Sequence, residues 1–278
     1  MCIRDSVNTI QSSLEKIPEI YFPKFKMEKI GEENPLLDEK LRVDIGDPVT
    51  KIATTQLADG EERFITGTQN GRILFYNLLG QKEWEYDCSG KVNAISCADI
   101  DKDGNVEILI GAGDELVILN QNGKRMQSYK FEKYYNREGN VQFVYSTDLE
   151  GDGESSIICG TDAWHVYAFD SKGEKRWVTE VYAHSTTVGA AADLDADGKK
   201  EVVVGTEYHT PINVFNSKGK PIWRSHKGQN GVCLELADLN GDGKTEVLFG
   251  TAGTTQYEMA HLFLFTHDGK LMWEADLG

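Results

Sequence analysis

The sequence predicts an all-β protein, a β-propeller of four-stranded blades, and two phased signals carry that prediction. The first is an acidic motif with four copies, at 98–112, 147–161, 192–206 and 237–251. Its first aspartates are 49, 45 and 45 residues apart: Asp99, Asp148, Asp193 and Asp238. The second is a glycine turn followed four positions later by tryptophan or glutamine: Gly80–Trp84, Gly123–Gln127, Gly173–Trp177, Gly219–Trp223 and Gly269–Trp273. A fixed period of about 45 residues is typical of propeller blades and is not expected of a β-sandwich.

Each repeat reads as strand, acidic loop, strand, short connection, strand, glycine turn and strand. Strands such as "HVYAFD" and "INVFN" lead into the glycine turns. An eroded copy, "TQLADGEERFITGT", precedes the four clear ones and adds a fifth unit. We expect the phased tryptophans to pack on the neighbouring blade. The expected blades are 48–91, 92–140, 141–183, 184–230 and 231–278.

The segment before the first blade is treated separately. Residues 1–6, "MCIRDS", resemble the translation of a sequencing adapter at the edge of a metagenomic fragment, and we exclude them as an artefact. Residues 7–35 match no blade and stay unassigned, whereas 36–47 resemble the last strand of a preceding blade, so the propeller region is 36–278. Because propellers close to remove exposed sheet edges, we expect the roughly five blades to be an incomplete set.

Composition and short motifs exclude several classes of protein. The formal net charge is −16, which disfavours nucleic acid as a partner because phosphates attract basic surfaces. No run approaches 18 apolar residues, so we expect no membrane span. No pair of cysteines or histidines has zinc-ligand spacing.

The acidic loops have the residue types and spacing of calcium sites. Oxygen-bearing side chains stand at positions 1, 3, 5 and 9, glycine at position 6, and position 7 offers its backbone carbonyl. In the first loop, positions 1, 3, 5, 7 and 9 are Asp99, Asp101, Asp103, Asn105 and Glu107. In the others they are Asp148, Glu150, Asp152, Glu154 and Ser156; Asp193, Asp195, Asp197, Lys199 and Glu201; and Asp238, Asn240, Asp242, Lys244 and Glu246. We predict up to four Ca²⁺ sites, the one with Ser156 being the weakest.

Other interpretations fit these loops less well. An EF-hand needs glutamate at position 12, where all four loops have an apolar residue. Catalytic carboxylates need two different environments, whereas copied loops repeat the same one. An Asp-Gly turn that binds nothing stays open for any single loop, but four loops with shared oxygen ligands favour metal. The eroded loop has Thr55, Leu57 and Arg63 at positions 1, 3 and 9, so we expect no metal there.

The combination of "DxDxDGxxE" with a following "GT" resembles the FG-GAP/VCBS repeat family, the calcium-bearing propellers of integrin α-chains and many bacterial surface proteins. The stretches "YAFDSKGEKRW" and "LFLFTHDGKLMW" are similar to the PQQ-like propeller repeat. Together the two patterns cover residues 48–278. The resemblance implies blades in which the acidic loop joins the first two strands and binds Ca²⁺, although such folds host many functions.

The face opposite the acidic loops is the expected place for a ligand. Alternating strands put the acidic loops and glycine turns on one face, and the remaining connections on the other. Those connections carry most of the histidines and several aromatic residues: Trp164, His165, His184, Tyr208, His209, His226, Tyr257 and His261, with Tyr134 and Tyr135. Loops of this kind on a rigid scaffold suit ligand binding. Any single histidine can instead be an ordinary polar loop residue, and this alternative stays open. A metal held by His165, His209 and His261 stays open as well.

These features predict a non-catalytic, calcium-stabilised binding module with a protein or glycan partner. No Ser/His/Asp elbow, phosphate-binding loop or HExxH motif supports catalysis. The alternative is the propeller domain of an enzyme, either polysaccharide-acting or a PQQ-type quinoprotein, and a purely structural spacer also stays open. The weak calcium affinity of extracellular modules favours an extracytoplasmic location, whether secreted, periplasmic or on the cell surface.

Overall fold

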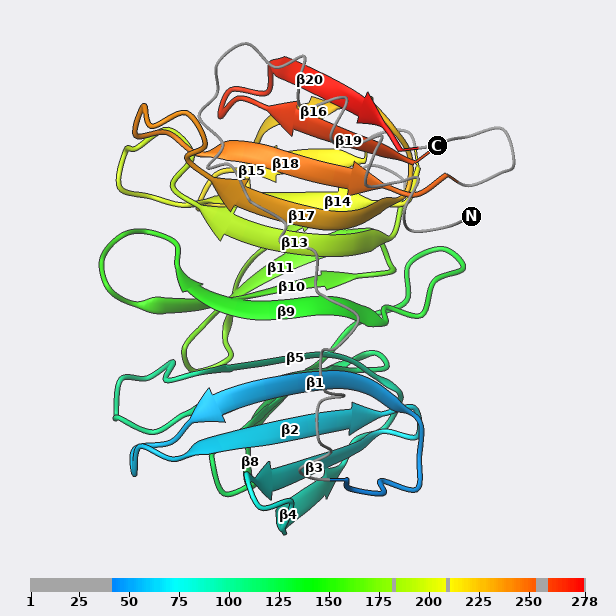
Figure 1. Ribbon diagram of the computed structural model, residues 1–278, viewed down its shortest axis with the longest axis vertical. Coiled ribbons are helices and arrows are strands. Elements are labelled where there is room, and N and C mark those ends of the chain that lie inside the picture. Colours follow the sequence, from blue (N-terminus) through cyan, green and yellow to red (C-terminus); the bar gives the residue numbers. More distant parts are fainter. Residues whose placement is uncertain (1–41, 182–183, 209–210, 254–259, 278) are drawn as a thin grey trace, which may run out of the picture.

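The computed structural model describes residues 42–181, 184–208, 211–253 and 260–277. Within these residues, 20 strands form five antiparallel sheets of four strands each. Every sheet is a meander in which consecutive strands pair, so the strand order in space follows the chain (Figure 1). The expected all-β class with four-stranded units is confirmed.

The strands are joined by short connections. The first sheet contains β1 (Val49–Gln56), β2 (Glu62–Thr68), β3 (Arg72–Asn77) and β4 (Lys82–Asp87). The second contains β5 (Val92–Ala98), β6 (Glu107–Ala112), β7 (Glu115–Leu119) and β8 (Arg125–Lys130). The third contains β9 (Val141–Asp148), β10 (Ser155–Thr161), β11 (His165–Asp170) and β12 (Lys175–Glu180). The fourth contains β13 (Thr186–Ala192), β14 (Glu201–Thr206), β15 (Ile212–Phe215) and β16 (Pro221–Ser225). The fifth contains β17 (Gly231–Ala237), β18 (Glu246–Thr251), β19 (His261–Phe265) and β20 (Leu271–Asp276).

The first strands of the five sheets lie next to one another. β1, β5, β9, β13 and β17 contact one another in that order, and the other strands of each sheet follow outward from them. In Figure 1 the strands β1, β9, β13 and β17 run toward the left of the view, so the loops that follow them share that side. This succession of meanders is the arrangement of propeller blades.

The chain before β1 contributes little to the described structure. Residues 42–48 contain no strand, and 36–41, the rest of the segment expected to resemble an outer strand, lie outside the described residues. Residues 1–35 lie outside them as well. In the part of the chain that is described, no helix has the length and apolar character needed to cross a membrane.

The middle strands form the core because both of their faces pack against neighbouring sheets. Every residue of β6 and β14 is buried, and Val202, Val203 and Val204 are fully inaccessible. Burying one such side chain contributes roughly 1.5–3 kcal/mol. Two-sided burial explains why these strands are continuous apolar runs, whereas the outer strands β4 and β12 alternate between exposed and half-buried residues.

The phased tryptophans link each sheet to the next. Their indole Nε1 atoms donate to backbone carbonyl oxygens of the following glycine turn: Trp84 to Gln121 at 2.9 Å, Trp177 to Ser217 at 3.0 Å and Trp223 to His267 at 2.8 Å. The ring of Trp84 also lies on Gly123, where a Cβ atom would come within 2.7 Å of it and where φ is +75°. Glycine is required at this turn for both reasons. The expected structural role of these three tryptophans is confirmed.

Candidate functional sites

Five equivalent loops join the first and second strands of the five sheets. In the second to fifth sheets they are 99–107, 148–156, 193–201 and 238–246, which we call the acidic loops. The equivalent segment of the first sheet is 55–63, which we call the arginine loop. All five lie at the same end of the strands, on the left in Figure 1.

The four acidic loops close in the same way. The first aspartate accepts a hydrogen bond from the position-6 glycine over 2.8–3.0 Å: Gly104 to Asp99, Gly153 to Asp148, Gly198 to Asp193 and Gly243 to Asp238. These glycines have φ of +84° to +89°, which disfavours other residues. The N–H at position 7 donates to the position-5 carboxylate over 2.7–2.9 Å from Asn105, Glu154, Lys199 and Lys244. The backbone donors, with Gly243 first, lower the pKa of Asp238.

Three acidic loops bury a glutamate at position 9. Glu107, Glu201 and Glu246 are 2%, 6% and 1% exposed. Each accepts a hydrogen bond from the backbone N–H at position 2, over 3.0, 2.9 and 2.9 Å respectively. Burial raises the pKa of Glu107 to about 7 and also raises that of Glu201, and the aspartates of each loop add repulsion. These carboxyl groups therefore gain from a nearby cation.

Two acidic loops bring three carboxylates together. One oxygen from each residue lies within 4.8 Å of the others in the sets Asp99, Asp101 and Glu107, and Asp193, Asp195 and Asp197. The Oδ1 atom of Asp99 is buried and lacks a hydrogen-bond partner among the described residues. Converging carboxylates with an unsatisfied buried oxygen repel one another unless a cation lies between them. The donor set, made only of hard oxygen atoms, fits Ca²⁺.

The loop 148–156 is already supplied with basic side chains. Ser156 accepts a hydrogen bond from Arg176 over 2.9 Å, and Lys199 of the next acidic loop lies 3.3 Å from Glu150. No set of three convergent acidic side chains is found in this fully described loop. The sequence revealed the missing glutamate at position 9, but Arg176 comes from β12 and was not anticipated.

The loop 238–246 has an amide in place of one carboxylate. Asn240 donates from Nδ2 to the buried Oε1 of Glu246 over 3.0 Å. The amide therefore satisfies the glutamate from within the loop. All residues of this loop are described, and its three acidic side chains, Asp238, Asp242 and Glu246, form no convergent set.

The arginine loop carries its own cation. Arg63, 8% exposed, donates to Glu83 over 2.9 Å and to Glu61 over 3.0 Å, and its guanidinium lies 3.5 Å from Asp59. The hydrogen bond to Glu83 is the main reason that the pKa of Arg63 is raised. At position 9 a guanidinium thus replaces the buried glutamate of the other loops. Its partner Glu83 comes from β4, which the loop motif alone did not indicate.

On the opposite face, Trp164 and His165 join Tyr134 and Tyr135 in one cluster. The rings of Tyr135 and Trp164 are stacked, with centroids 5.0 Å apart and planes at 28°. Tyr134 meets Tyr135, Trp164 and His165 edge-on at 4.9, 5.6 and 4.9 Å. The cluster joins the β8–β9 connection to the β10–β11 turn.

The other candidate ligand residues that are described do not gather into one centre. His184 meets Tyr208 edge-on with centroids 5.5 Å apart, and His261 stacks on Phe263 at 5.5 Å. His226 is exposed after β16, and His209 and Tyr257 lie outside the described residues. Among the residues that are described, no metal-ligand set of three includes a histidine.

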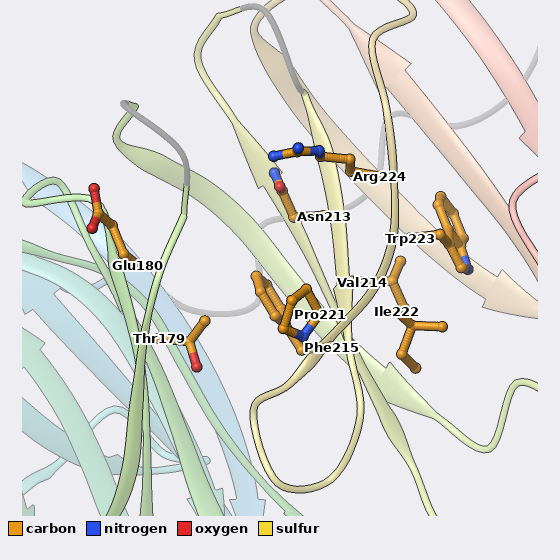
Figure 2. A pocket seen from close by; sticks show the side chains of 9 residues that line it. All are labelled: Thr179, Glu180, Asn213, Val214, Phe215, Pro221, Ile222, Trp223 and Arg224. Carbon is orange, nitrogen blue, oxygen red and sulfur yellow. The ribbon is translucent and has the colours of Figure 1, made fainter.

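A groove of about 540 Å³ separates the outer parts of the third and fourth sheets (Figure 2). Thr179 and Glu180 of β12 line one side, and β15 and β16 line the other with Asn213, Val214, Phe215, Pro221, Ile222, Trp223 and Arg224. The ring of Trp223 points away from Thr179 in Figure 2, in keeping with its bond to the fifth sheet. None of the predicted site residues lines this groove.

The fold and the loops define a propeller-like protein with repeated acidic motifs, and two partial family matches agree with that class. Residues 63–136 match the lambda-carrageenase beta-propeller domain, and residues 193–249 match the FG-GAP-like repeat. The FG-GAP resemblance is therefore confirmed for the region with the third and fourth acidic loops. The PQQ-like resemblance stays a prediction. A search of curated proteins finds no relative.

Solved structures with the same fold include propellers from several settings. The Vibrio cholerae biofilm matrix protein Bap1 has a TM-score of 0.65 and 18% identity, over 83% of this chain and 40% of its own. The WD40 beta propeller domain of Doa1 has a TM-score of 0.58 and 12% identity, over 82% of this chain and 68% of its own. The rhamnogalacturonan lyase YesW has a TM-score of 0.57 and 15% identity, over 82% of this chain and 57% of its own. The chain thus spans less than half of Bap1, and these likenesses establish the propeller-like fold.

Proposed function

We propose that this chain is a calcium-stabilised propeller module that binds a protein or glycan ligand through the face opposite the acidic loops. The observation that carries the proposal is the convergence of three carboxylates in the loops 99–107 and 193–201. The unpartnered buried Oδ1 of Asp99 adds to it, since desolvated carboxylate oxygen is costly without a partner.

Calcium has a structural role in this proposal. Asp99, Asp101 and Glu107 would hold one ion, and Asp193, Asp195 and Asp197 a second. The ion supplies positive charge that removes the repulsion within each loop. Because these two loops join β5 to β6 and β13 to β14, this neutralisation stabilises the connection between the first two strands of the second and fourth sheets.

An extracytoplasmic location is supported by two of the likenesses. Bap1 is a biofilm matrix protein, and the family matched by residues 63–136 is the lambda-carrageenase beta-propeller domain. A matrix lies outside the cell, where weak calcium sites of extracellular modules are found. We extend that location, and a glycan as one class of ligand, to this chain.

A propeller domain of a polysaccharide-acting enzyme is the second candidate. It is favoured by the match to a carrageenase propeller and by the likeness to a rhamnogalacturonan lyase. Cleavage by the purified chain would establish it over the binding module: hydrolysis of lambda-carrageenan, measured as released reducing ends, or β-elimination of rhamnogalacturonan, measured as released unsaturated ends. Absence of both products would leave the binding module as the better account.

The proposed function is tested by the melting temperature of the 278-residue chain in excess Ca²⁺ and in EGTA. At free Ca²⁺ tenfold above Kd, each occupied site adds about 1.4 kcal/mol to the free energy of unfolding. We expect a higher Tm in calcium and no such rise with Mg²⁺, which prefers rigid octahedral sites. Equal Tm values in calcium and EGTA would contradict the proposal.

A further inference from the structure

The turn between the second and third strands ends in glycine in the first sheet and in tryptophan in the third sheet. In the first sheet this turn ends in Gly71, whose φ is +88° and whose carbonyl accepts the N–H of Cys88 over 2.8 Å. In the third sheet Trp164 occupies the equivalent place, with φ of +63° and its carbonyl bound to the N–H of Val181 over 2.6 Å. The same backbone conformation thus holds a glycine in one sheet and a tryptophan in the other.

A tryptophan is an unfavourable choice for this conformation. The left-handed region brings Cβ close to the following carbonyl oxygen, so glycine is the unstrained residue there. Non-glycine residues held in this region gather at functional sites, where the surrounding structure maintains the strain. The presence of Trp164 therefore calls for a reason other than the stability of the turn.

Tyr135 repeats the same pattern in the neighbouring loop. The backbones of Tyr134 and Arg137 exchange hydrogen bonds of 3.1 and 3.0 Å, which makes a two-residue hairpin turn. Tyr135 is the first residue of that turn, with φ of +51°, and is 78% exposed. Its ring stacks on Trp164 with centroids 5.0 Å apart. Two aromatic residues with positive φ, one from the connection that enters the third sheet and one from a turn within it, thus stack on one another.

The two loops are tied together beneath the rings. The carboxylate of Asp162 accepts the backbone N–H groups of Gly139 and Asn140 over 2.9 and 2.7 Å and the side-chain amide of Asn140 over 2.8 Å. Because Asp162 precedes Trp164 by two residues, these bonds hold the 132–140 connection against the turn. We call Tyr134, Tyr135 and Trp164 the aromatic platform.

We propose that the aromatic platform binds a pyranose ring of a neutral polysaccharide, with the sugar stacked on the open face of Tyr135. One side of a pyranose presents C–H groups that complement the negative face of an aromatic ring. The stacking on Trp164 fixes the orientation of Tyr135 in advance, which lowers the entropic cost of binding. This inference rests on the ligand face of the proposed function and assigns its residues and its ligand class.

The surroundings of the platform favour a neutral sugar over a charged ligand. The two basic side chains of the 132–140 connection are paired with acids, Lys133 with Glu138 and Arg137 with Glu207, the latter at 3.1 Å. Sulfate or phosphate groups therefore meet no uncommitted cation on this connection. A quaternary ammonium needs several ring faces that converge on it, whereas Tyr135 and Trp164 are nearly parallel and cover one another.

The test uses affinity gel electrophoresis of the whole chain in gels that contain agarose, xylan, galactomannan or mixed-linkage β-glucan, with calcium present. We expect at least one of these to retard the protein, and Tyr135→Ala to weaken that binding at least tenfold with an unchanged Tm. Leu79→Ala is the matched control, because Leu79 is 75% exposed and lies at a glycine turn on the other face. It should bind as the unaltered chain does.

Trp164→Gly provides an independent arm. Glycine suits a φ of +63°, so the turn should persist while the support of Tyr135 is lost and binding weakens. Polysaccharide binding that survives both substitutions overturns the platform but leaves a ligand face elsewhere. Retardation by none of the four polymers also overturns it. A further gel contains lambda-carrageenan, and retardation in that gel alone overturns the choice of a neutral sugar. Loss of retardation when tetramethylammonium is added would do the same. The calcium proposal is judged separately by Tm in EGTA, so the two failures are distinguishable.

Discussion

The arginine loop and the acidic loop 193–201 join the same two strands of their sheets, but their acidic side chains are placed in opposite ways. In 193–201, Asp193, Asp195 and Asp197 converge within 4.8 Å. In 55–63, the guanidinium of Arg63 lies among Asp59, Glu61 and Glu83. The comparison teaches that one loop places a basic side chain among its acidic groups, whereas the other brings three carboxylates together without one.

The loop 148–156 lies between these two cases. Its carboxylates remain, but Ser156 replaces the buried glutamate and contacts Arg176, while Lys199 reaches Glu150. Two side chains from β12 and the next loop thus neutralise part of its charge. We therefore expect calcium to matter most in the loops whose acidic side chains converge without a basic side chain between them.

The largest effect is expected from removing the internal cation. Arg63→Met keeps the volume of the side chain but leaves Asp59, Glu61 and Glu83 without their shared partner. The Arg63 side chain is 9% exposed, whereas its acidic partners are 32–70% exposed. The variant therefore leaves three acidic groups repelling one another at a half-exposed site, and Tm should fall. Calcium should not restore it, because positions 1 and 3 are Thr55 and Leu57.

The control for that change is Arg72→Ala. Arg72 lies 3.5 Å from Glu85 on the surface of the same sheet, with 35% of its side chain exposed. Exposed pairs contribute about 0–1 kcal/mol, so its loss should be small. If both variants lowered Tm equally, Arg63 would have no special role in its loop.

The next largest effect is a difference in calcium binding between the loops 193–201 and 148–156. Replacing Asp193 and Asp195 by alanine should remove one calcium from the stoichiometry measured by calorimetric titration. The loss of calcium-dependent stability is about 1.4 kcal/mol at free Ca²⁺ tenfold above Kd. The paired control replaces Asp148 and Glu150 by alanine, and should change both quantities less. The reverse order would refute the ranking of the loops by basic neighbours.

Restoring a calcium site in the loop 148–156 tests the same comparison in the opposite direction. Ser156→Glu combined with Arg176→Ser restores the position-9 carboxylate and removes its competing cation. Calorimetric titration should then show one additional calcium, worth about 1.4 kcal/mol under the same condition. Arg176→Ser alone is the control, since it leaves the loop without a position-9 acid. An unchanged stoichiometry in the double variant would mean that Lys199 is sufficient to exclude the ion.

The smallest effect expected near neutral pH is the pH dependence of loop 99–107. Burial raises the pKa of Glu107 to about 7, above its value in the unfolded chain. In EGTA the folded state therefore holds an extra proton between about pH 4.5 and 7, and its stability falls as pH rises through that range. Calcium competes with this proton, so its affinity should weaken about tenfold per pH unit below 7.

Calorimetric titration at pH 6, 7 and 8 in buffers of different ionisation enthalpy measures the protons released on calcium binding. Glu107→Gln should abolish the release at this loop. The arginine loop should contribute no such step, because the raised pKa of Arg63 keeps it charged throughout. Proton release that persists in the glutamine variant would assign it to another group.

Much of the fold followed from the sequence because its signals are local and repeated. The spacing of Asp99, Asp148, Asp193 and Asp238 predicts the repeated units, and the indole bonds of the phased tryptophans agree with the expected packing. The loop closures are equally local, since each position-6 glycine binds an aspartate five residues before it.

The candidate sites were only partly predictable. All four acidic loops have similar motifs, yet two of them bring three carboxylates together. The other two loops instead have Arg176 on β12 bound to Ser156 and the amide of Asn240 bound to Glu246, contacts that depend on where side chains lie in space. Likewise, Trp164 was a candidate ligand residue, but its stacking on Tyr135 joins loops of different sheets.

The sequence by itself determined the repeat, the all-β class and the positions of the acidic loops, because periodic residues act on neighbours a few positions away. Only the tertiary structure decided which loops carry an internal cation and which aromatic rings form a platform. Charge neutralisation and ring stacking act over a few ångströms between residues far apart in the chain. Arg63 with Glu83, Ser156 with Arg176 and Tyr135 with Trp164 meet only after the strands have paired.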